Sequence, residues 1–120
     1  QTHQDVLRGV VVYATADYNI YFPANTGKPL AYMGVHGLSD KTCPISAGRS
    51  SRDRFVKNNK CTVPATVPEA KSGGNYVTYD YKCPDNLPVR WVTFSGAHTY
   101  PPNDNGTWVH GLTWEFIKRF

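Results

Sequence analysis

The sequence has no long apolar run and no concentration of charge. Its longest apolar stretch, Val10 to Ala14, is far shorter than the about 20 residues that a membrane-spanning helix needs. The 13 basic and 9 acidic side chains leave a formal net charge of +4, and the basic ones are scattered along the 120 residues instead of forming a stripe. We therefore expect neither a membrane segment nor a nucleic-acid partner.

Cysteine is scarce, with only Cys43, Cys61 and Cys83, and no two of them stand in a Cys-x-x-Cys pair. That spacing matches no zinc pattern, so we expect no zinc site. No other metal or cofactor is expected either. Because the number is odd, two cysteines can pair within the chain, and the third is then free or pairs outside it. Asn105 begins an Asn-x-Thr glycosylation sequon. Sequon and cysteines together favour a secreted, extracellular protein.

The pattern of apolar residues predicts a single α/β domain. β-branched or alternating runs predict strands, and helical spacing of Trp114, Ile117 and Phe120 predicts a closing helix. The expected strands cover residues 6–14, 29–37, 76–81 and 89–94, and the expected helices cover residues 46–59 and 107–120. We expect Trp91, Trp108 and Trp114 to belong to the core. Strands interleaved with helices indicate a sheet with crossover connections.

Two residues that suit acyl transfer follow predicted strands. Asp40 comes just after the strand that ends at Gly37, and His98 comes just after the strand that ends at Phe94. Sites in open α/β sheets form outside the carboxyl ends of strands. An aspartate that orients a histidine, in the chain order serine, aspartate, histidine, is the arrangement of α/β-hydrolases. Asp40 could instead be a turn former or helix cap, and His98 an ordinary exposed histidine. His36 is expected to pack at a strand end and to hydrogen-bond a neighbouring loop.

Several short motifs, in their order along the chain, resemble the fungal feruloyl esterases. The matching segments are Met33-Gly34-Val35-His36-Gly37-Leu38-Ser39-Asp40, Pro44-Ile45, Gly48-Arg49, Arg52-Asp53-Arg54-Phe55 with Asn58 and Cys61, Tyr81 with Cys83, Val89 with Trp91, Gly96-Ala97-His98-Thr99-Tyr100-Pro101, and Trp114-Glu115-Phe116. These esterases belong to carbohydrate esterase family 1, which also includes polyhydroxybutyrate-depolymerase-like and acetylxylan esterases. The resemblance covers nearly the whole chain.

The resemblance implies that residues 1–120 form the C-terminal part of one α/β-hydrolase catalytic domain, with Asp40 as the triad acid and His98 as the general base. It also implies a disulfide between Cys61 and Cys83. Tyr100 and Trp108 follow His98 in sequence and are candidate substrate contacts.

The chain contains no Gly-x-Ser-x-Gly elbow. The resemblance therefore implies that the nucleophilic serine and the oxyanion hole lie on an N-terminal chain or segment of the same enzyme. Without that part, this chain should be inactive. Cys43 is our candidate for a disulfide to it.

The function that the resemblance implies is that of a secreted serine carboxylesterase that hydrolyses feruloyl, or hydroxycinnamoyl, esters of plant cell-wall polysaccharide, including xylan. Two alternatives stay open. One is an acetylxylan esterase or polyhydroxybutyrate-type depolymerase of the same fold. The other is a non-catalytic carbohydrate-binding relative, because fold does not imply function.

Overall fold

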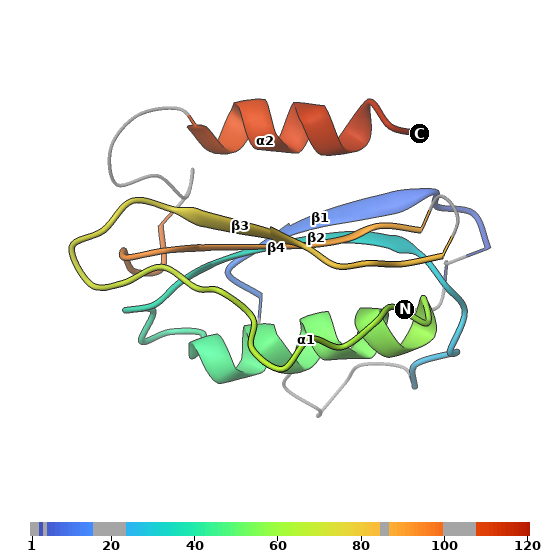
Figure 1. The fold of residues 1–120 in the computed structure, drawn as a ribbon, viewed down its shortest axis with the longest axis horizontal. Coiled ribbons are helices and arrows are strands. Elements are labelled where there is room, and N and C mark those ends of the chain that lie inside the picture. The colour runs from blue at the N-terminus through green and yellow to red at the C-terminus, as the bar shows by residue number, and fades with distance from the viewer. Residues whose placement is uncertain (1–2, 4, 16–23, 85–86, 100–107) are drawn as a thin grey trace.

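The computed structural model describes residues 3, 5–15, 24–84, 87–99 and 108–120. The described chain is a mixed four-stranded sheet in the order β1-β2-β4-β3, with one helix on each face (Figure 1). The strands are β1 (Gly9–Tyr13), β2 (Ala31–Gly37), β3 (Val77–Asp80) and β4 (Val89–Phe94), and the helices are α1 (Ile45–Asn58) and α2 (Trp108–Ile117). The expected α/β class is confirmed.

The three strands β1, β2 and β4 run parallel, whereas β3 pairs antiparallel with β4. The carboxyl ends of β1, β2 and β4 therefore meet at one edge of the sheet, which we call the carboxyl edge. The central strand β2 is buried along all seven residues. Such a strand reads as a continuous apolar run, because helices cover both of its faces.

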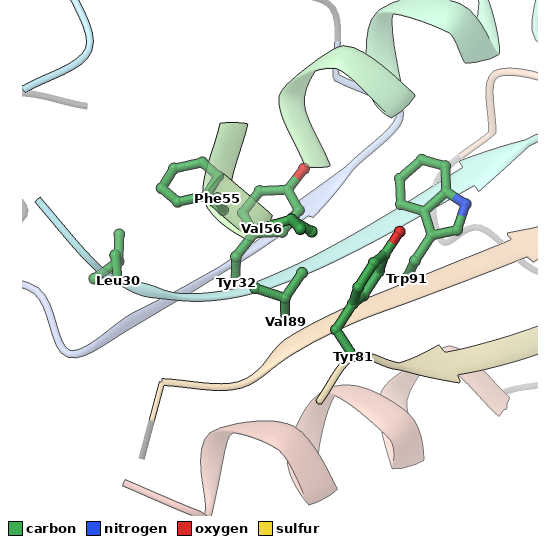
Figure 2. Close-up of a cluster of buried hydrophobic side chains, with 7 residues drawn as sticks. All are labelled: Leu30, Tyr32, Phe55, Val56, Tyr81, Val89 and Trp91. Carbon is green, nitrogen blue, oxygen red and sulfur yellow. The ribbon is translucent and has the colours of Figure 1, made fainter. Parts of the chain in front are cut away.

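Successive residues of β2 supply two separate cores. Tyr32 points toward α1 and stacks on Phe55, with ring centroids 4.5 Å apart (Figure 2). Met33, on the opposite face, belongs to the cluster that holds Val109 and Phe116 of α2. This alternation is the period of two expected of a strand. It fixes which side chains of the later site face which helix.

Tertiary contacts change the predicted elements at their ends and on one helix face. The strand expected over residues 6–14 forms only from Gly9, and Val6 and Leu7 before it are exposed. The expectation that Trp114 belongs to the core was wrong, because Trp114 is 66% exposed; Ile117, which lies in the helix as predicted, is 48% exposed. The face of α2 that packs on the sheet carries Val109 and Phe116 instead.

The segment between α1 and β3 is tied to the sheet. The predicted disulfide between Cys61 and Cys83 is present and links the end of α1 to the segment after β3. Further along, the main-chain N–H of Ala70 donates to the Thr93 hydroxyl at 2.7 Å, and the Trp91 indole donates to Glu69 at 3.0 Å. These bonds hold a proline-containing loop without regular secondary structure.

No helix in the described ranges is long and apolar enough to cross a bilayer.

Candidate active site

Asp40 lies in the turn that follows β2 at the carboxyl edge. Its side chain has no exposed surface. Carboxylate Oδ1 accepts the main-chain N–H of Thr42 at 2.9 Å and that of Cys43 at 2.7 Å. These local bonds form an Asx-type turn and leave Oδ2 available for another partner.

The loop that carries His98 approaches this turn closely. The N–H of Leu38 donates to Phe94 O at 2.9 Å, and the N–H of Ser39 donates to Gly96 O at 3.0 Å. Gly37 makes this approach possible, because a Cβ there would collide with the carbonyl oxygen of Gly96. The absence of a side chain at residue 37 therefore brings the two loops together.

Asp40 and His98, the two predicted site residues, are 58 residues apart in sequence and lie in direct contact. His98 Nδ1 is 2.9 Å from Asp40 Oδ2, and the imidazole side chain is 43% exposed. An ionised carboxylate can only accept, so Nδ1 carries the proton and donates it. The other ring nitrogen, Nε2, is then the one with a lone pair that can accept a proton from another group.

The environment of Asp40 keeps it ionised. Burial by itself raises the pKa of this carboxyl, but hydrogen bonds from the Cys43 N–H, His98 and the Thr42 N–H outweigh burial, so the pKa lies below its ordinary value. A buried anion beside a half-exposed imidazole stabilises the imidazolium that forms when Nε2 takes up a proton. The pair is therefore equipped for general base catalysis.

His36 is a further buried group beside this pair. As expected, it packs at the end of β2 and hydrogen-bonds a neighbouring loop: Nε2 is 2.7 Å from Cys43 O. The same nitrogen is 3.7 Å from Asp40 Oδ2. His3 and His110, in contrast, are exposed.

The candidate substrate contacts fall partly outside the described residues, which do not include Tyr100 or the sequon residue Asn105. Trp108 opens α2, half-buried, and stacks on Tyr76 with ring centroids 4.3 Å apart. It also packs edge-on against Phe94, at 5.8 Å. Tyr76 is 39% exposed and was not among the predicted site residues. The antiparallel pairing of β3 with β4 carries Tyr76 to the carboxyl edge, a signal that no local motif contains.

Cys43 has a free, half-buried thiol. Its main chain already contributes to the site through the bonds to Asp40 and His36. In the part of the chain that the structure describes, no group of three or more His, Cys, Asp or Glu side chains could hold a metal ion.

Comparison with known proteins gives a consistent result. The chain is 36% identical over 101 residues to "Feruloyl esterase D" of Neurospora crassa, a match that covers 81% of this chain and 35% of that protein. It is 35% identical over 92 residues to "Probable feruloyl esterase C" of Aspergillus niger and 34% identical over 92 residues to "Feruloyl esterase C" of Emericella nidulans, each covering 74% of this chain and 33% of the relative. No family model matches the chain.

The chain thus spans about a third of the length of the curated relatives it matches. The relatives that it matches are feruloyl esterases, and the match is consistent with a C-terminal part of a fungal feruloyl esterase.

Proposed function

We propose that this chain is the C-terminal part of an α/β-hydrolase domain and supplies the aspartate and the histidine of a serine esterase that hydrolyses feruloyl esters. The observation that carries the proposal is the contact between the buried Asp40 carboxylate and the half-exposed His98 imidazole, at 2.9 Å. The relatives' names, feruloyl esterase C and D, support the reaction class.

The proposed reaction is acyl transfer through a covalent intermediate. A serine on the remainder of the protein attacks the ester carbonyl, and Nε2 of His98 takes up its proton. The imidazolium then protonates the leaving alcohol, and water releases the acid by the reverse path. Asp40 holds the Nδ1 tautomer and stabilises the imidazolium throughout. No metal or organic cofactor enters this scheme.

The edge of strand β1 offers a place where a strand from the remainder of the domain can pair. Within the described residues β1 pairs only with β2, and its Val10, Val11 and Val12 are half-buried. A further strand added parallel to β1 would bury these valines and end at the carboxyl edge. A strand-to-helix turn with the serine would then arrive on the same side as Asp40 and His98.

We also propose that Cys43 forms a disulfide with that remainder, because it is the free cysteine and adjoins the site. Mass analysis of the complete protein, with and without reductant, tests this bond. An alkylated Cys43 peptide in the unreduced protein would contradict it.

The identity of the acyl group, feruloyl, rests mainly on the names of the relatives. Trp108 is our candidate aromatic contact for the substrate, next to Tyr76 at the carboxyl edge. Rates on methyl ferulate, acetyl esters and hydroxybutyrate oligomers distinguish a feruloyl esterase from an acetylxylan esterase or a polyester depolymerase. Preference for acetyl esters or hydroxybutyrate oligomers would transfer the assignment to the corresponding alternative.

Secretion is part of the proposal. It rests on the disulfide between Cys61 and Cys83, which suits an oxidising compartment. Glycosylation of Asn105 would accompany secretion, and glycosidase treatment of the secreted protein would reveal it as a loss of mass.

The decisive experiment substitutes His98 in the complete protein. We expect His98→Ala to lower kcat on methyl ferulate by at least about 10³-fold, as loss of a triad member does. His110→Ala is the matched control, because His110 is an exposed histidine of α2 to which the proposed reaction assigns no role. Near-normal activity of the His98 variant would refute the function.

A further inference from the structure

The turn that holds Asp40 is itself held by a buried side chain. His36 is 1% exposed, and its Nε2 is 2.7 Å from Cys43 O. A carbonyl oxygen only accepts, so Nε2 carries the proton in this bond. The N–H of Cys43 donates in turn to Asp40 Oδ1 at 2.7 Å. Cys43 is therefore anchored at both of its main-chain groups, by His36 at one and by Asp40 at the other.

The His36 ring has little freedom to leave this position. Gly48 of α1 lies against it, and a Cβ at residue 48 would collide with His36 Nδ1 and come within 2.8 Å of Cε1. The Trp91 ring lies near it, with centroids 6.1 Å apart. Because α1 and the sheet fix the His36 ring, its hydrogen bond to Cys43 O also restricts the movement of the turn.

We propose that His36 is a positioning residue, whose hydrogen bond to Cys43 O sets the turn at residues 40–43 so that Asp40 Oδ2 points at His98. The inference rests on the proposed function, since it assigns a residue that acts through the triad acid. His36 touches no reacting atom. A displacement of about 1 Å in a catalytic group can cost about 10²-fold in rate, which is the size of effect expected when this bond is lost.

Two amide variants of His36 distinguish the effect of its hydrogen bond to Cys43 O from the effect of the space that its side chain fills. In His36→Gln the side-chain amide reaches the position of Nε2 and can still donate to Cys43 O. In His36→Asn the amide is one methylene shorter and reaches only the position of Nδ1. Both variants place a similar polar group in the same buried site, so they differ mainly in this one bond.

The complete protein carrying each variant is assayed on methyl ferulate well below its unfolding temperature. We expect His36→Gln to keep kcat within about threefold of the parent and His36→Asn to lose about 10- to 100-fold, both with unchanged KM. Gly48→Ala, which displaces the ring and leaves its chemistry intact, should also lower kcat. Val56→Ala is the control, because Val56 is a buried core residue of α1 that makes no bond to the turn. It should lower stability and leave kcat unchanged.

Equal kcat in the Gln and Asn variants would overturn the inference. If His36→Asn does not fold, Gly48→Ala decides: a lowered kcat supports the inference and a normal kcat overturns it. His98→Ala separates this from the proposed function, because an active His98→Ala protein refutes the esterase site as a whole.

Discussion

Asp40→Asn tests the role of the carboxylate with the least change in shape. The N–H groups of Thr42 and Cys43 both point at Oδ1, at 2.9 Å and 2.7 Å, so the asparagine carbonyl oxygen must take that place. The amide NH₂ group then occupies the position of Oδ2, 2.9 Å from His98 Nδ1. Two donors cannot face each other, so Nδ1 must give up its proton and accept.

The consequence is a histidine in the wrong tautomer. Its proton moves to Nε2, the nitrogen that takes up the serine proton in the proposed reaction. We expect kcat to fall by about 10³- to 10⁴-fold, or about 4 to 5.5 kcal/mol of transition-state stabilisation, with little change in KM. The fold itself should lose only about 1–2 kcal/mol, because the hydrogen bonds remain and only their charge is lost.

The sign of the pH effect on stability follows from the lowered pKa of Asp40. Burial raises this pKa, but the hydrogen bonds from Cys43, His98 and Thr42 outweigh it and bring it below the ordinary 3.8. The stabilisation by Asp40 is therefore fully present above about pH 4 and is lost as the pH falls through the folded-state pKa. The asparagine variant should lack this acid-dependent loss.

The assay combines steady-state kinetics of the complete protein on methyl ferulate with urea unfolding from pH 2 to 7. Asp53→Asn is the matched control, because Asp53 is an exposed carboxylate on α1 that pairs with Arg52. It should leave kcat unchanged. A folded Asp40→Asn protein with kcat within tenfold of the parent would show that Asp40 does not orient the catalytic base.

Three further changes test the parts that support the site. Replacing Cys61 and Cys83 by alanine should lower the free energy of unfolding by about 3 kcal/mol in urea melts, and an unchanged midpoint would contradict that. Glu69→Gln should reduce the loss of stability on acidification below about pH 4.5, because the pKa of Glu69 is lowered by bonds from Arg49 and Trp91 that outweigh burial. A parent-like pH profile would argue against this. Gly37→Ala should lower kcat by about 10²-fold through collision with the loop that carries His98; normal activity would disprove this dependence.

Local pattern was enough to find the four strands, though not all of their ends, and to give the order of the candidate site residues. The strand β4 has the predicted bounds, and β2 starts two residues later than predicted and ends at the predicted Gly37. Alternation and β-branched runs are properties of a few neighbouring residues, so they can be read without the fold. The turn after β2 and the loop after β4 were recognisable for the same reason. The resemblance then supplied the pairing of Cys61 with Cys83.

Other features depended on contacts between distant segments. Which face of α2 is buried follows from where it docks on the sheet, so Phe116 is in the core and Trp114 is not. Spacing within the helix alone could not distinguish these two faces. The partners of Glu69 depend on the path of the loop between α1 and β3, which has no periodic pattern to read.

The sequence by itself determined which residues could do the chemistry, an aspartate and a histidine each following a strand. Tertiary structure decided that they meet. Parallel pairing of β2 with β4 puts both loops at one edge, and the bare backbone at Gly37 lets them approach until Asp40 and His98 are 2.9 Å apart. Tertiary structure also decided that His36 anchors the turn, because its bond to Cys43 O requires the strand end and the turn to fold back on each other. Distances of this kind depend on the packing of whole elements, which no short stretch of sequence specifies.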